Sequence, residues 1–145
     1  MSHDYGLRRF AVLHHAGAAG DPPHYDFLFD TSDTSSLVTF RLPEWPLASG
    51  STHPALKLRD HRRIYLTYEG QISGDRGHVS RVAEGDLYVS EIAGRWMLCR
   101  PQQPLLLFEP VRGDEWQVTR SVQPARSSAP SDASTPPDAA GGPGY

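Results

Sequence analysis

The sequence predicts an all-β protein, a compact antiparallel β-barrel with short connecting loops, from two observations. Short apolar segments follow one another along residues 8–119, and Gly, Pro, Asp or Ser stands in nearly every gap between them. No segment combines a sustained helical period with helix caps. Because strands separated by turns every ~8–12 residues are typical of sandwiches and barrels, we expect a closed or nearly closed antiparallel barrel.

The first expected strand covers residues 8–14, where Phe10 and Val12 alternate with Ala11 and Leu13. The second covers 24–29 and alternates in the same way. Further strands are expected at 37–41, 55–59, 64–68, 77–82, 86–92, 95–100, 104–109 and 115–119. Gly94 is expected in a hairpin turn between the last residue of one strand and the first of the next.

Length and composition predict one barrel domain at residues 1–120, followed by a tail at 121–145. The chain has 145 residues, of which 38% are hydrophobic, with three Trp, six Tyr and five Phe, so it can form a core. The tail is rich in Pro, Ser, Ala and Gly and contains almost nothing to bury. Such a segment cannot offset the entropy of ordering, and we expect it to be disordered.

The formal net charge of −3 argues against a protein whose whole surface binds DNA. The single cysteine, Cys99, excludes an internal disulfide and is expected to be a buried, unreactive thiol. No apolar stretch is long enough for a signal peptide or a membrane span, so a cytoplasmic location away from membranes is the expectation.

The second expected strand carries two candidate metal ligands. His24 and Asp26 are two positions apart, so in a strand both side chains point to one face. The opposite face carries Tyr25, Phe27 and Phe29. An imidazole nitrogen beside a carboxylate oxygen suits a divalent transition metal with open positions. The alternative is an ordinary strand face that is polar and solvated.

Four segments in this order resemble the 3'-phosphoesterase domain of bacterial DNA ligase D and its stand-alone relatives. That family typically reads R-F-V-V-x-x-H, H-Y-D-F-R-L-E, A-V-P-K-G-P and E-D-H-P-x-x-Y-x-x-F-E-G. The corresponding segments here are R-F-A-V-L-H-H at 9–15, H-Y-D-F-L-F-D at 24–30, R-L-P-E-W-P at 41–46 and R-D-H-R-R-I-Y-L-T-Y-E-G at 59–70. The resemblance covers roughly residues 8–110 and implies a β-barrel core.

The resemblance implies that His15, His24 and Asp26 bind a divalent metal, Mn²⁺ first, with Zn²⁺ or Co²⁺ as alternatives. His15 follows the Arg-Phe pair at the family spacing. His14, the other candidate, would point to the opposite face of a regular strand. The family separates its two histidines by six positions and this chain by nine, and the extra residues in 16–23 have loop composition.

The resemblance also implies that His61 and Tyr65 act at the phosphate. The histidine would donate a proton to a leaving oxygen or stabilise charge, and the tyrosine would donate a hydrogen bond to a phosphate oxygen. The alternatives are that His61 is a turn residue following Asp60 and that Tyr65 is an aromatic side chain packed in the barrel.

Three basic positions of the family pattern differ in this chain. Leu28 replaces an Arg, Glu44 replaces a Lys, and His53 stands at a basic position eight residues before His61. Because Arg holds phosphate through two charge-assisted hydrogen bonds, three outcomes are open: activity is reduced, Arg59, Arg62 or Arg63 compensates, or the substrate differs. The candidates for phosphate or nucleic-acid binding are Arg9, Arg59, Arg62, Arg63 and His53.

Two functions follow from the resemblance. The first is a metal-dependent 3'-phosphoesterase, a hydrolase of DNA repair and non-homologous end joining that removes a 3'-phosphate or a terminal ribonucleotide. The second is a catalytically impaired barrel that serves as a binding or scaffolding module in a repair assembly. The implied partners are nucleic-acid 3'-ends and a DNA ligase or end-joining proteins, and a monomer is expected.

Overall fold

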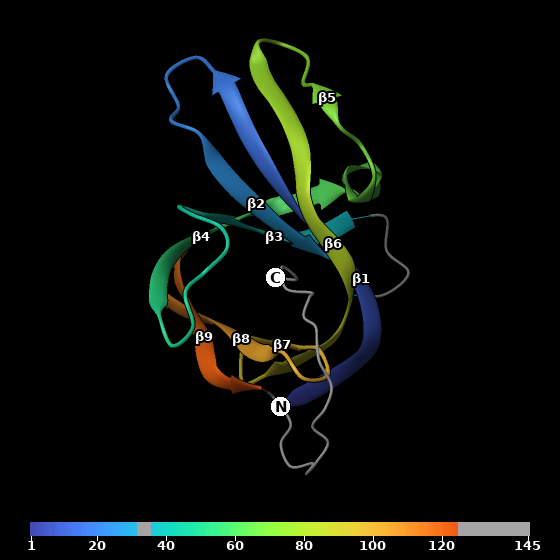
Figure 1. Ribbon diagram of the computed structural model, residues 1–145, viewed down its shortest axis with the longest axis vertical. Helices are drawn as coiled ribbons and strands as arrows, with labels where there is room; N and C mark the ends of the chain where they lie inside the picture. Colours follow the sequence, from blue (N-terminus) through green and yellow to red (C-terminus); the bar gives the residue numbers. More distant parts are fainter. Residues whose placement is uncertain (32–35, 125–145) are drawn as a thin grey trace.

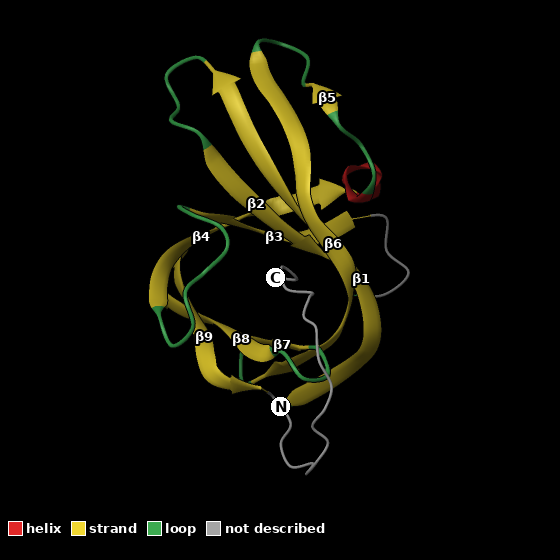
Figure 2. Ribbon diagram, in the orientation of Figure 1, coloured by secondary structure: helices red, strands yellow, loops and turns green. Residues whose placement is uncertain are grey.

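The computed structural model describes residues 1–31 and 36–124, which form a closed antiparallel barrel of eight strands (Figures 1 and 2). The strands are β1 (Ser2–Ala18), β2 (His24–Phe29), β3 (Ser36–Leu42), β4 (Thr52–Arg62), β5 (Gly70–Gln71), β6 (Arg76–Ile92), β7 (Arg95–Cys99), β8 (Pro104–Arg112) and β9 (Glu115–Pro124). Neighbours follow the order β1-β2-β3-β4-β9-β8-β7-β6, and β6 pairs with β1 to close the ring. The short β5 pairs with β6 outside the ring. The expected all-β barrel is therefore confirmed.

Strand β6 corrects one expectation, because segments 77–82 and 86–92 form a single strand that passes through Gly85. Gly85 lies opposite Phe10 of β1, and a Cβ atom there would come within 3.3 Å of the Phe10 ring. The glycine therefore provides space for an aromatic side chain inside a continuous strand, where the sequence suggested a turn.

The expected strand at 64–68 is also wrong. Its first part forms a 3₁₀ turn, η1 (Arg63–Leu66), drawn in red in Figure 2. The N–H groups of Thr67 and Tyr68 both donate to the carbonyl of Ile64, so the chain turns here and does not extend. Leu66 is buried by this turn against the outside of the barrel.

Other strand boundaries also move, since β1 begins at Ser2 and β4 spans Thr52–Arg62, both longer than expected. Strand β1 continues through Ala18, where the sequence suggested a loop, because beyond the ring it still pairs with the start of β6. Strand β9 continues to Pro124, so the barrel extends four residues beyond the predicted boundary at 120. The rest of the predicted tail, 125–145, lies outside the described residues.

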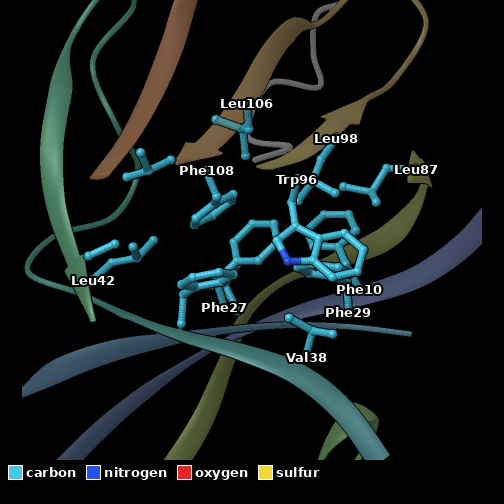
Figure 3. Packing of buried hydrophobic residues seen from close by; sticks show 14 of the residues in the cluster. Phe10, Phe27, Phe29, Val38, Leu42, Leu87, Trp96, Leu98, Leu106 and Phe108 are labelled. Atoms are coloured by element: carbon cyan, nitrogen blue, oxygen red, sulfur yellow. The ribbon is translucent and has the colours of Figure 1, made fainter. Parts of the chain in front are cut away.

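The barrel interior is filled by aromatic rings, shown in Figure 3. Phe27 of β2 lies 5.5 Å, centroid to centroid, from both Phe10 and Phe108, and Phe40 stacks on Phe108 at 4.4 Å. All four are fully buried. Truncating one such ring to Ala costs about 3–5 kcal/mol, so this cluster is a main source of stability.

A second apolar cluster lies on the outer face of β1, β2 and β3. It consists of Ala11, Leu13, Leu28, Leu37, Leu66 and Val79, with Tyr65, Tyr68 and Ile72 packed against it. Its strand residues alternate with the interior rings, so they point outward. Because η1 and the chain leading to β5 cover it, the outer wall of the barrel is partly buried, and the polar residues of β2 lie at its edge.

Candidate metal centre

His15, His24 and Asp26 converge on the outer face of the β1–β2 pair. In this antiparallel ladder His15 lies opposite His24, and Leu13 lies opposite Asp26. The Asp26 carboxylate is 3.7 Å from Nδ1 of His15 and 3.5 Å from Nε2 of His24. One ligand atom from each residue lies within 4.8 Å of the others. The structure thus brings together the three residues that the sequence singles out as metal ligands.

Two atoms of this group are buried without a hydrogen-bond partner among the described residues, Nε2 of His24 and Oδ1 of Asp26. Their residues are only 6% and 3% exposed, so this is not the solvated strand face considered above. A buried polar atom without a partner costs about 1–3 kcal/mol. A cation between these atoms would satisfy both, and two nitrogens with one carboxylate suit Mn²⁺, Zn²⁺ or Co²⁺. The residues present fit a divalent metal.

Backbone carbonyls orient both imidazoles. Nε2 of His15 lies 2.5 Å from the carbonyl oxygen of Arg76, and Nδ1 of His24 lies 3.3 Å from that of Pro22. A carbonyl oxygen only accepts, so each of these nitrogens carries a proton. The second nitrogen of each neutral ring then presents a lone pair toward Asp26. Metal-binding histidines are commonly fixed by such a hydrogen bond from the other ring nitrogen.

The two imidazoles differ in their affinity for protons. Interaction with Asp26 raises the pKa of His15, although burial acts in the opposite direction. Burial lowers the pKa of His24, and this effect outweighs the opposing charge of Asp26; the charge of Arg41 also lowers the pKa. His24 is therefore held in the neutral form that a metal requires. The protonated form of His15 pairs with the carboxylate, so its Nδ1 must lose that proton before the lone pair can bind a metal.

His14 lies on the other face of β1. Its ring is 5.0 Å from that of Tyr25, the residue opposite it on β2. The regular alternation of the strand separates it from Asp26. Of the two adjacent histidines, His15 is therefore the one that shares a face with the other candidate ligands.

His61 and Tyr65 come to the same place from the end of β4 and from η1. Nε2 of His61 is 3.9 Å from Oδ2 of Asp26, and its Nδ1 lies 3.1 Å from the carbonyl oxygen of Arg59. The His61 and Tyr65 rings are 5.8 Å apart. They border a cleft of about 460 Å³, here called the basic cleft for its three arginines. Its polar lining consists of His15, Asp26, Arg59, Asp60, His61, Arg62, Tyr65 and Arg76.

Three of the predicted phosphate-binding residues, two arginines and a histidine, do not line the basic cleft. Arg63 makes two hydrogen bonds, of 2.6 and 3.1 Å, to the buried carboxylate of Asp30. Arg9 pairs with two acidic residues of β6, Glu84 at 3.3 Å and Asp86 at 3.9 Å. Both guanidinium groups are paired with carboxylates, and neither lines the basic cleft, so a role for these two arginines in phosphate binding stays a prediction.

His53 lies on the start of β4, beside Glu44, whose carboxylate is 3.6 Å from its Nε2. These two departures from the family pattern thus contact one another. The third, Leu28, is fully buried in the outer apolar cluster. An apolar side chain is therefore what its surroundings accommodate.

Arg41 is the residue that sequence reasoning missed. It lies on β3 directly opposite Asp26, and its charge acts on both imidazoles. Its Nε atom is buried and has no hydrogen-bond partner among the described residues. An arginine in the mostly apolar segment 37–42 is unusual, and this could have drawn attention to it. That it lies opposite Asp26, however, depends on the register between β2 and β3.

No protein-family model matches this chain, and no match to it is found among curated proteins. Among the described residues, no helix has the length and apolar character needed to cross a membrane. The resemblance to ligase D phosphoesterase domains therefore depends on the four sequence segments.

Proposed function

We propose that this barrel is a metal-dependent phosphoesterase that acts on nucleic-acid 3'-ends. The observation that carries the proposal is the convergence of His15, His24 and Asp26 beside the basic cleft, with two buried ligand atoms that lack partners. The four segments that resemble the ligase D domain support the same activity.

His15, His24 and Asp26 would hold the divalent metal, which supplies a Lewis acid and an activated water at the phosphate. His61, next to the carboxylate, is placed to donate a proton to a leaving oxygen. Tyr65 donates a hydrogen bond to a phosphate oxygen. Arg59 and Arg62, which line the same cleft, attract the phosphates of the strand.

A second candidate is a non-catalytic module that binds nucleic-acid ends in a repair assembly with a DNA ligase or other end-joining proteins. One observation favours it: Leu28 is buried, and His53 contacts Glu44, so three basic groups of the family pattern are absent from the centre. Losing one preorganised donor at a transition state commonly costs about 10²–10³ in rate.

Hydrolysis assays on defined ends separate the two candidates. The substrates are duplexes that carry a 3'-phosphate, a 3'-terminal ribonucleotide or a 3'-hydroxyl, each tested with Mn²⁺, Zn²⁺, Co²⁺ or a chelator. The phosphoesterase predicts metal-dependent product from either of the first two. End binding without product under any metal would reject the enzyme and leave the binding module.

A further inference from the structure

A second and larger cleft, of about 770 Å³, opens on the other side of the candidate metal centre. It lies between the start of β2, the end of β3, the start of β4 and the start of β9, and Figure 1 shows β4 and β9 side by side there. This apolar cleft is lined by His24, Arg41, Leu42, Pro54, Leu56 and Trp116, among other residues. Prolines and aliphatic side chains dominate its wall, in contrast to the basic cleft.

The two clefts meet along one row of residues across the outer face. Leu13 of β1, Asp26 of β2, Arg41 of β3 and Leu56 of β4 are successive cross-strand neighbours. Cross-strand neighbours have Cβ atoms about 4.5–5.5 Å apart. Asp26 borders the basic cleft, whereas Arg41 and Leu56 border the apolar one. The metal centre thus lies at the boundary, since His15 borders the first cleft and His24 the second.

Arg41 differs from the other arginines that have a buried nitrogen without a partner. Arg81 is also paired with Glu84, at 3.3 Å, and Arg120 also donates to the carbonyl of Leu47. Arg100 lies over the ring of Phe10, 5.6 Å from its centroid. For Arg41, the buried Nε has no acceptor among the described residues. A guanidinium with free donors beside a metal centre suits a phosphate, which accepts two parallel hydrogen bonds from it.

We infer that Arg41 and the apolar cleft form a binding site for a terminal nucleoside, joined through its 5'-oxygen to the phosphate at the metal centre. The inference rests on the proposed function. The rest of the strand carries a negative charge at every phosphate and therefore lies in the basic cleft, along Arg59, Arg62 and Arg76. The nucleoside beyond the last phosphate is uncharged, and its flat base and sugar match prolines, Leu56 and Trp116.

Mononucleotides test this arrangement without any turnover. Calorimetry with Mn²⁺ compares inorganic phosphate with a nucleoside 5'-monophosphate, which attaches its nucleoside through the oxygen that faces the apolar cleft. We expect the nucleotide to bind about tenfold or more tightly than phosphate. Equal affinities would overturn the inference.

Two substitutions test the phosphate-binding and nucleoside-binding parts of the site separately. Arg41→Gln removes charge-assisted hydrogen bonds and is expected to weaken phosphate and the nucleotide alike, by about 10- to 100-fold. Leu56→Glu places a carboxylate in the apolar cleft at a residue that is 37% exposed, so the fold tolerates it. It should remove the advantage of the nucleotide while phosphate binding changes little.

The matched control is Leu7→Glu, which adds the same charge at an exposed leucine of β1 and should leave both affinities unchanged. If Leu56→Glu acts like this control, or if Arg41→Gln has no effect, the inference is wrong. A wild-type protein that binds no phosphate in the presence of the metal would instead reject the proposed function itself.

Discussion

His15 and His24 lie opposite each other on β1 and β2, with ring centroids 4.7 Å apart. They form the last pair of this ladder, and the carbonyls of Arg76 and Pro22 fix their orientation. Both imidazoles are therefore positioned by hydrogen-bonded backbone before any metal binds. Such preorganisation lowers the entropy lost on binding.

The first prediction is one metal site per chain. Calorimetric titration with Mn²⁺ or Zn²⁺ should give about one site, and His24→Ala should lose it because His24 is one of only three proposed protein ligands. His14→Ala is the matched control, since it removes the adjacent histidine on the other face, and it should bind like wild type. A loss of affinity in the control alone would show that His14 is the ligand.

The second prediction separates metal binding from phosphate chemistry. His61→Ala should keep the metal affinity within a few-fold of wild type but reduce hydrolysis by about 10²–10⁴, the range for a general acid. Its 3.9 Å separation from Asp26 places it next to the ligand group, outside the three residues that share one centre. Loss of the metal in His61→Ala would make it a fourth ligand.

The third prediction concerns Cys99, which is partly buried where the sequence suggested a buried residue. Burial raises the pKa of its thiol, and Asp4 acts in the same direction. Because the thiolate is the reactive form, iodoacetamide at pH 8 should modify the folded protein several-fold more slowly than the unfolded protein in urea. Equal rates would place Cys99 in an accessible, unperturbed environment.

The same shift predicts a pH effect on stability. Above pH 9, the ordinary thiol value, the unfolded state releases its proton while the folded state still binds it. The free energy of unfolding should therefore fall as pH rises through this region. Cys99→Ala removes this contribution, so the difference between wild type and variant isolates it.

Strand β2 shows how much of the fold the local sequence can predict. Its bounds follow from the alternation of His24 to Phe29 and from the two prolines before it, and the structure has the same bounds. Gly85 and segment 64–68 mislead for a common reason. Gly85 makes room for the ring of Phe10 on β1, and segment 64–68 covers the outer apolar cluster. In both cases the contact is with residues distant in the sequence, so the local pattern does not reveal it.

The candidate site also has residues that the sequence predicts and residues that depend on contacts between strands. His24 and Asp26 follow from a spacing of two within one strand, and His15 from its place in a motif. Arg41 depends on the register between β2 and β3, and Arg63 is removed from the cleft by its pairing with Asp30. Cross-strand register is set by the hydrophobic pattern of both strands together, so single residues do not reveal it.

The last prediction tests whether the position of Leu28 can hold a phosphate-binding arginine, as the family pattern has it. Leu28 is fully buried and packs with Leu13, Leu37 and Leu66 beneath η1. Leu28→Arg would bury a guanidinium without a partner. Because an uncompensated buried charge costs about 3–5 kcal/mol, urea denaturation should show a loss of this size. Leu28→Met, which conserves volume, should lose less than about 1.5 kcal/mol.

Binding of inorganic phosphate to Leu28→Arg in the presence of Mn²⁺ completes the test. We expect no gain in affinity, because the new side chain would point into the outer apolar cluster and Arg41 already faces the centre from β3. The opposite result, a stable variant that binds phosphate more tightly, would mean that η1 can move away from β2. The guanidinium at position 28 would then reach the metal centre and bind phosphate there.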